Sequence, residues 1–173
     1  MLRMTLITAA LALVVAATAT AQGSQPNDAQ IAHIAYTAGV IDIEAGKLAL
    51  SKSHSRVVRE FAREMVRDHG AVNDQALALV KRLGVMPQDN PTSAALRSAA
   101  DARLRDLRRL KGRAFDRAYV ANEVAFHRTV NQALASTLIP AAQNGELKSL
   151  LQTGLKLFTE HQHHAEMLKG ELK

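Results

Sequence analysis

Apolar residues recur every three or four positions along four long stretches of this chain, and each stretch is bounded by turn signals. This period is that of an amphipathic helix whose apolar face packs into a core. No stretch alternates apolar and polar residues as a half-buried strand does. The sequence therefore predicts an all-α protein. We expect the four long helices at about residues 28–51, 56–83, 114–140 and 146–171.

The lengths of the connections predict the topology. Short turns join the first long helix to the second and the third to the fourth, so each pair should be antiparallel. Roughly 30 residues separate the second and third long helices. They contain a break at 84–91 and a shorter helix, which Thr92 should cap, which should run to about Leu110 and which Gly112 should end. A crossover of this length makes the second and third long helices parallel. We therefore expect a ferritin-like antiparallel four-helix bundle with a long helical crossover between helices 2 and 3.

The first 21 residues fit a secretory signal peptide. Arg3 gives a positive start, residues 6–17 are apolar but too short to span a bilayer, and Ala19-Thr20-Ala21 forms a small-residue cleavage site. We expect cleavage after Ala21, a polar tether over residues 22–27 and the bundle over residues 28–172. The mature chain should then be periplasmic or secreted, with no transmembrane span.

The composition excludes several classes of function. The chain has no cysteine, which excludes disulfides, thiol catalysis and cysteine-based metal sites. Aromatic residues make up only 3% of the chain, so stacking on bases or sugars is not expected to be its main role.

Each long helix carries one ionisable residue within its predicted apolar stripe: Glu44, His69, His127 and His161. Because an unpaired buried charge is very costly, these residues are expected to be partners of one another. A transition metal ion bound by three imidazoles and a carboxylate is the simplest way to join them, and zinc, iron and copper all accept such ligands. The alternative is that each histidine is a core residue whose hydrogen bonds other protein groups satisfy.

Distances along the helices separate the candidates. His127 and His161 each lie about 17 residues from the Asn144-Gly145 turn, so they should be level. Glu44 and His69 lie about 10 and 15 residues from the first turn, an offset of roughly 7 Å at about 1.5 Å per residue. Glu44 is therefore either a direct ligand or an acceptor for one. Further ligands, or groups that hydrogen-bond to the ligands, are expected among Glu123, His164, Met65, Asp68 and Tyr119.

The chain lacks the Glu-x-x-His pattern of ferritin-like diiron sites, because Val66 and Val124 stand three positions before His69 and His127. A mononuclear or histidine-rich site fits better. Too few other acid–base groups accompany these residues to support catalysis, so we expect a binding role rather than an enzyme.

Several motifs resemble those of the domain of unknown function family 4142, over nearly all of residues 28–172. They comprise Gly39 and Glu44 followed by Gly46-Lys47-Leu48-Ala49, Val58-Arg59-Glu60-Phe61-Ala62, Met65-Val66-Arg67-Asp68-His69, Phe115-Asp116-Arg117-Ala118-Tyr119-Val120, His127, Glu146-Leu147-Lys148 and His161. In the family an Asp-His pair often recurs on the third long helix, where this chain has Phe126-His127. The resemblance implies a ferritin-like bundle of exported bacterial proteins, some of them named as outer-membrane proteins, and it implies no activity.

The net charge of +6 arises mostly from one segment, 97–113, which contains seven basic residues and only two acidic ones. The basic residues are Arg97, Arg103, Arg105, Arg108, Arg109, Lys111 and Arg113. They form either a solvated face of the crossover helix or a patch that attracts an anionic envelope surface. Export argues against a nucleic acid partner. The sequence thus favours an exported metal-binding protein for metal handling or envelope stress, with a non-catalytic envelope interaction protein as the alternative.

Overall fold

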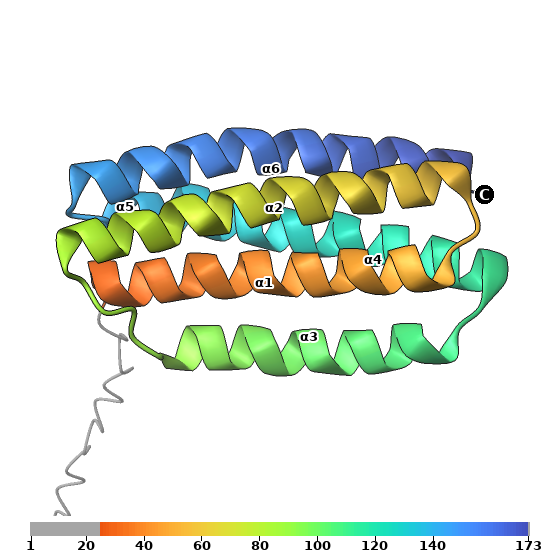
Figure 1. Ribbon diagram of the computed structural model, residues 1–173, viewed down its shortest axis with the longest axis horizontal. Coiled ribbons are helices and arrows are strands. Elements are labelled where there is room, and N and C mark those ends of the chain that lie inside the picture. The colour runs from red at the N-terminus through yellow and green to blue at the C-terminus, as the bar shows by residue number, and fades with distance from the viewer. Residues whose placement is uncertain (1–24, 173) are drawn as a thin grey trace, which may run out of the picture.

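The computed structural model describes residues 25–172, which are helical apart from short connections (Figure 1). In chain order the elements are α1 (Asp28–Lys52), α2 (Arg56–Leu83), α3 (Pro91–Arg109), α4 (Gly112–Ala133), the π-helix η1 (Leu134–Leu138), α5 (Ile139–Ala141) and α6 (Gly145–Glu171). This part of the chain contains no strand, so the all-α prediction is confirmed. The expected signal peptide, residues 1–21, lies outside the described residues. Within them, no helix has the length and apolar character needed to cross a bilayer.

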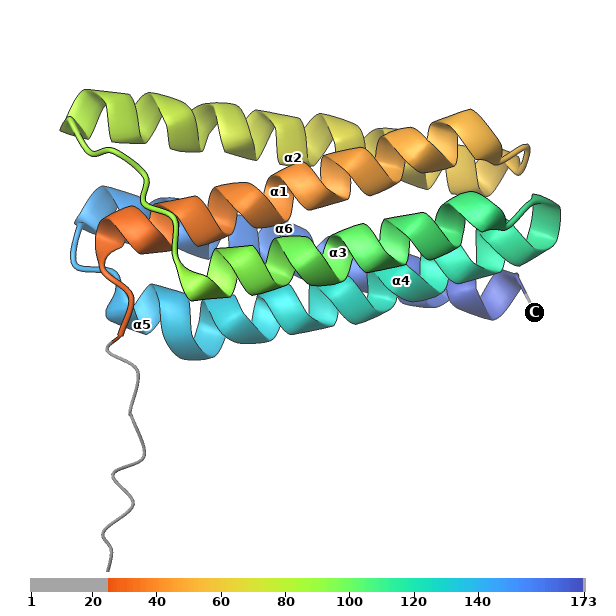
Figure 2. The same ribbon diagram turned by 90° about the horizontal axis from the view of Figure 1, so that it is seen from below.

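The helices α1, α2, α4 and α6 run along a common axis, and α3 lies beside α1 and α4 (Figures 1 and 2). The pairs α1–α2 and α4–α6 each run in opposite directions, as their short connections require. Because α3 carries the chain back along the length of the molecule, α2 and α4 run in the same direction.

The boundaries of α3 differ slightly from those that the sequence predicts. Asn90, rather than Thr92, caps this helix, and its side chain accepts a hydrogen bond from the backbone N–H of Ser93 at 3.0 Å. Pro91 occupies the first helical position, where its missing N–H costs nothing. Gly112 does not end α3 but begins α4, with a φ of 52° that glycine adopts readily.

A π-helical turn follows α4 at the point where the sequence predicts a kink or an end at Pro140. The N–H of Ile139 bonds to the carbonyl oxygen of Leu134, five residues earlier. Since Pro140 has no N–H to donate, the regular α-helical pattern of hydrogen bonds cannot continue through this point. Single π turns of this kind are found frequently at functional sites.

Two clusters of buried apolar residues fill the interior, one toward each end of the long helices. One cluster contains Phe61, Met65, Phe115 and Tyr119, and the other contains Ile31, Leu79, Leu134 and Leu151.

Between the two clusters, each of the four long helices carries a buried polar residue. These residues are Asp42 on α1, His69 on α2, His127 on α4 and His161 on α6. We call this level of the interior the polar layer; it also includes Glu123.

Candidate metal centre

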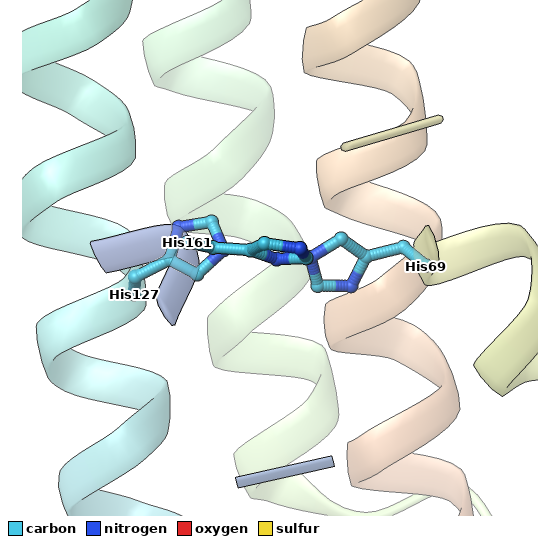
Figure 3. A group of neighbouring side chains, drawn as sticks. All are labelled: His69, His127 and His161. Carbon is cyan, nitrogen blue, oxygen red and sulfur yellow. The ribbon is translucent and has the colours of Figure 1, made fainter. Parts of the chain in front are cut away.

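Three histidines from three helices meet in the polar layer (Figure 3). One ring nitrogen of each of His69, His127 and His161 lies within 4.8 Å of those of the other two. Their ring centroids are 5.3–5.5 Å apart, and no side chain of the three is more than 2% exposed. The structure therefore brings together the three histidines that the helical pattern selects.

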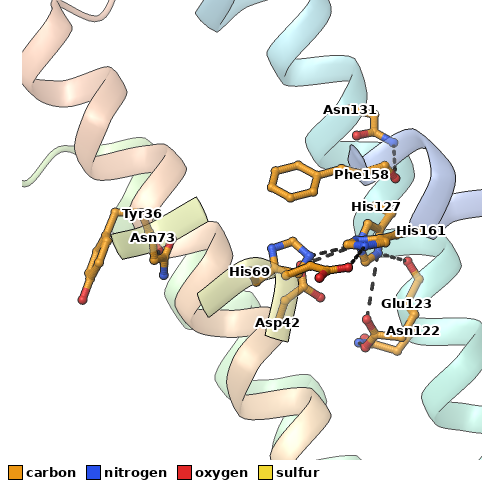
Figure 4. A network of polar contacts seen from close by, with 11 residues as sticks. Tyr36, Asp42, His69, Asn73, Asn122, Glu123, His127, Asn131, Phe158 and His161 are labelled. Atoms are coloured by element: carbon orange, nitrogen blue, oxygen red, sulfur yellow. Dashed lines mark hydrogen bonds and ion pairs between the residues drawn. The ribbon is translucent and has the colours of Figure 1, made fainter. Parts of the chain in front are cut away.

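Asp42 of α1 supplies the acidic group beside these rings (Figure 4). Its Oδ2 atom lies 3.3 Å from Nε2 of His69 and 3.9 Å from Nε2 of His127, and the two Nε2 atoms are 3.4 Å apart. These separations exceed the usual length of a hydrogen bond, about 2.7–3.2 Å. An ion bound tetrahedrally at about 2.0–2.1 Å separates its ligand atoms by roughly 3.4 Å. The three atoms thus have the spacing of three ligands of one ion.

Glu44, which the sequence places in the apolar stripe of the first helix, lies elsewhere. Its side chain is 43% exposed, and its carboxylate pairs with the guanidinium of Arg97 at 2.7 Å. It belongs to none of the potential metal-binding groups among the described residues. The predicted burial of Glu44 is wrong because α1 contacts α2, α3 and α4. Its buried surface is therefore broader than a single apolar stripe, and the positions of Ile and Leu alone do not locate it.

The burial of Asp42 could have been predicted from the small residues around it in the sequence. Ala38, Ala45, Gly46 and Ala49 are all buried, and together they mark the face of α1 that approaches α2 closely. A Cβ atom on Gly46 would lie 3.0 Å from the backbone oxygen of Ala62. Since Asp42 lies in the middle of this small-residue face, the pattern of Ala and Gly, rather than that of Ile and Leu, indicates its burial.

Neighbouring groups decide which ring nitrogen carries a proton. Nδ1 of His127 lies 3.0 Å from the backbone oxygen of Glu123, so Nδ1 donates and Nε2 presents its lone pair to the polar layer. Nε2 of His161 lies 3.1 Å from Oδ2 of Asp68, which leaves Nδ1 as the acceptor. Within the described residues this buried Nδ1 has no hydrogen-bond partner. A carboxylate or carbonyl that orients an imidazole in this way is typical of metal-binding histidines.

Asp42 and Glu123 form a pair of fully buried carboxyl groups. The pKa of Asp42 is raised well above its ordinary value by burial and then by the charge of Glu123 and a hydrogen bond with it. Burial raises the pKa of Glu123 to about 7, although hydrogen bonds with Asp42 and Asn122 oppose the increase. Without a cation, burial therefore favours the protonated form of a carboxyl group in this pair.

The imidazoles are neutral for the same physical reason. Burial lowers the pKa of His127 to about 4. The pKa of His69 is lowered well below its ordinary value, first by burial and then by repulsion from His127 and His161. Burial also lowers the pKa of His161, although its hydrogen bond with Asp68 opposes the decrease. All three rings thus present lone pairs at neutral pH, the form in which imidazole binds metals.

Two of the other predicted ligands or hydrogen-bonding groups, Met65 and Tyr119, are buried next to the polar layer. Met65 is fully buried in the cluster that contains Phe61. The hydroxyl of Tyr119 is buried without a hydrogen-bond partner in the described part of the chain, and its pKa is raised well above the ordinary value by burial and then by Glu123 and Asp42. Tyr119 therefore lies close enough to the carboxyl pair to respond to its charge.

Asp68 and His164 instead lie between the polar layer and the surface. His164 is 38% exposed, and its Nδ1 lies 2.8 Å from Oε2 of Glu64, a residue that the sequence pattern did not select. Ligand atoms of Glu64, Asp68 and His161 lie within 4.8 Å of one another. This half-exposed group connects the buried histidines with solvent.

Comparison with known proteins gives a family and a fold. No curated protein matches the chain significantly. A solved structure of a Streptomyces coelicolor DUF305 protein, described as secreted, is 12% identical and has a TM-score of 0.69, covering 83% of this chain and 91% of that one. A model of the family named Domain of unknown function (DUF4142) matches residues 13–168. The match spans both apolar clusters and the polar layer between them, and the chain therefore belongs to the DUF4142 family.

Proposed function

We propose that this protein binds one transition metal ion in the polar layer, with His69, His127, His161 and Asp42 as its ligands. The observation that carries the proposal is the triangle of Nε2 of His69, Nε2 of His127 and Oδ2 of Asp42, whose edges are 3.3, 3.4 and 3.9 Å. Three imidazoles and a carboxylate suit zinc, iron and copper. Glu123, whose carboxyl group lies within 4.8 Å of ligand atoms of Asp42 and His127, offers a further oxygen.

We also infer that the four long helices form a ferritin-like antiparallel bundle, with α3 as its crossover, and that the chain is exported. The directions of the helices support the bundle. The pattern of residues 1–21 supports cleavage after Ala21 and a periplasmic or secreted mature chain, and the DUF305 protein with a similar fold is described as secreted.

The proposed role is metal handling, or a response to envelope stress, rather than catalysis. The ligands come from four helices and are almost fully buried, so an ion would join all four helices and stabilise the folded state. A redox enzyme would need an open coordination position that substrate can reach. Turnover of peroxide or superoxide by metal-loaded protein, lost in His127→Ala, would establish that activity instead.

Metal analysis of the purified protein, followed by titration with zinc, copper and iron(II), tests the proposal. An ion at about 100 times its Kd stabilises the folded state by about 2.7 kcal/mol, which raises the Tm by roughly 5–10 °C in a chain of this size. His69→Ala and His127→Ala should abolish the increase. His163→Ala should retain it, because His163 lies on α6 with a side chain that is 71% exposed. Protein that contains no metal, and whose Tm no metal raises, would contradict the proposal.

A second candidate function rests on α3. Leu104 and Leu107 of this helix are buried, whereas Arg103, Arg105 and Arg108 are exposed, so its basic side chains face away from the core. We propose, as the alternative, that this face of the helix attracts an anionic envelope surface.

Vesicles with and without anionic lipid test this alternative. Replacing Arg103, Arg105, Arg108 and Arg109 with Ser should abolish binding to the anionic vesicles. Arg97→Ser serves as a control, because Arg97 is half-buried and its guanidinium pairs with Glu44 and Asp101. Unchanged binding by the fourfold variant would refute the alternative.

A further inference from the structure

A cavity of about 210 Å³ lies next to the polar layer, and it reaches the surface beside the exposed residues Thr92 and Thr129. Residues of α1, α2, α3, α4, η1 and α6 line it, and most of its wall is aliphatic, including Ile34, Val72 and Leu151. Phe158 forms the part of the wall nearest the histidines, since its ring also stacks on that of His69 with centroids 4.4 Å apart and planes at 16° (Figure 4).

Small side chains leave part of this space open. Small residues from three helices line the cavity, among them Ala38, Ala76 and Gly154. On the wall nearest the turn to α6, Leu134 and Leu138 both belong to the π-helical turn that precedes Pro140. Because buried side chains normally pack without large gaps, a cavity of this size beside the core is a specific feature of the fold.

The lining selects against water and charge. None of the described residues that line the cavity is charged. Two of its polar side chains already have acceptors: the amide of Asn73 donates to the backbone oxygen of Tyr36 at 3.4 Å, and the hydroxyl of Thr129 donates to that of Ala125 at 3.0 Å. A cavity with so few free polar groups holds water poorly and favours an apolar occupant.

We propose that this cavity is a binding site for a small uncharged apolar molecule, with the size of an aromatic ring that carries a short alkyl group. A cavity of roughly 150 Å³ lined by apolar side chains already holds benzene, and this one is larger. The bound molecule contacts one face of the Phe158 side chain, whose ring separates it from His69. The site needs no metal, so it stands independently of the proposed metal centre.

Titration of the purified, metal-free protein with ethylbenzene, followed by NMR of backbone amides, tests the proposal. We expect saturable binding, with shifts concentrated on residues around the cavity. Ala133→Leu should weaken binding by at least about tenfold, because the larger side chain occupies the cavity. Ala121→Leu is the matched control, since Ala121 is also half-buried on α4 but does not line the cavity.

Two further measurements keep the test decisive. Phenylacetate, which resembles ethylbenzene but carries a carboxylate, should not bind, because burying an unpaired charge is very costly. If Ala133→Leu does not fold, Ala76→Leu fills the cavity from α2 and should show the same loss. The proposal is overturned if ethylbenzene does not saturate, if phenylacetate binds equally well, or if a folded filling variant binds as tightly as the wild type.

Discussion

Oδ2 of Asp42 lies 3.3 Å from Nε2 of His69, and both side chains are almost completely buried. This contact joins α1 to α2 at the level where His127 and His161 enter from the other two long helices. In an isolated Asp–His pair, a single long contact would have to offset the cost of burying two polar groups. Together with the other two imidazoles, the same pair would supply four donor atoms to the metal ion that we propose.

Asp42→Asn should weaken the binding of zinc by at least about tenfold, because the amide oxygen carries no charge to balance that of the ion. The matched control is Glu44→Gln on the same helix, which should leave the affinity unchanged, since Glu44 pairs with Arg97. Competition with a chromophoric chelator measures both affinities. Loss of affinity in Glu44→Gln, without loss in Asp42→Asn, would instead support Glu44 as the ligand.

The contrast between these two acids shows how far the sequence could predict the site. A period of three to four residues predicts that His69, His127 and His161 are buried, as they are, because α2, α4 and α6 each bury a well-defined seam. On α1, Ile34, Ile41 and Leu48 suggest a seam through Glu44. The buried surface of α1 includes Ile34 and Ile41 but also extends through Ala38, Asp42 and Ala45, because α1 contacts α3 as well as its neighbours in the interior.

The general fold was easier to predict than its local irregularity. Turn signals and connection lengths indicate an all-α chain, and the helix boundaries agree with the structure to within a few residues. The apolar pattern does not indicate the π-helical turn at Leu134–Leu138, however. The presence of Pro140 alone does not distinguish a kink from a π turn. Leu134 and Leu138 of that turn line the cavity beside Phe158, so the shape of this cavity could be found only from the structure.

Asp68→Asn should weaken zinc binding by about 10–100-fold, although Asp68 is not expected to touch the ion. Its carboxylate accepts from Nε2 of His161 at 3.1 Å, which fixes the ring and directs Nδ1 inward. Asp74→Asn is the control, because Asp74 is exposed on the same helix. Equal affinities in the two variants would show that the contact with His161 does not position this ring for binding.

The metal-free protein should lose stability through His127 as the pH falls from 6.5 toward 4. The pKa of His127 is about 4 in the folded protein and 6.5 in the unfolded chain, so the unfolded state takes up a proton first. The contribution is present above pH 6.5 and amounts to roughly 3 kcal/mol. Urea unfolding of the wild type and His127→Gln between pH 4 and 7 measures it. A difference between the two proteins that does not shrink toward pH 4 would contradict the expectation.

Glu123 should have the opposite dependence. Its folded-state pKa of about 7 exceeds the ordinary 4.5, so its contribution is present below pH 4.5 and is lost as the pH rises through 7. The free energy of unfolding of the wild type, relative to Glu123→Gln, should fall by roughly 3 kcal/mol across this range in metal-free protein. Glu160→Gln, an exposed substitution on α6, should show no such change. Parallel pH profiles for the wild type and Glu123→Gln would count against a shared proton in the carboxyl pair.

Gly39→Ala should destabilise the protein by about 1–3 kcal/mol, even though alanine is the better helix former. A Cβ atom at this position would lie 2.3 Å from Oδ1 of Asn73, a buried side chain whose amide donates to the backbone oxygen of Tyr36. The side chain of Asn73 would have to leave this position, one turn along α2 from His69, and its hydrogen bond would break. Gly70→Ala provides the control: nothing lies within 4 Å of the added atom, so this change should stabilise the protein by about 0.5–1 kcal/mol. Thermal unfolding should therefore show a lower Tm for Gly39→Ala and a higher Tm for Gly70→Ala. A higher Tm in both variants would show that the side chain of Asn73 moves without cost.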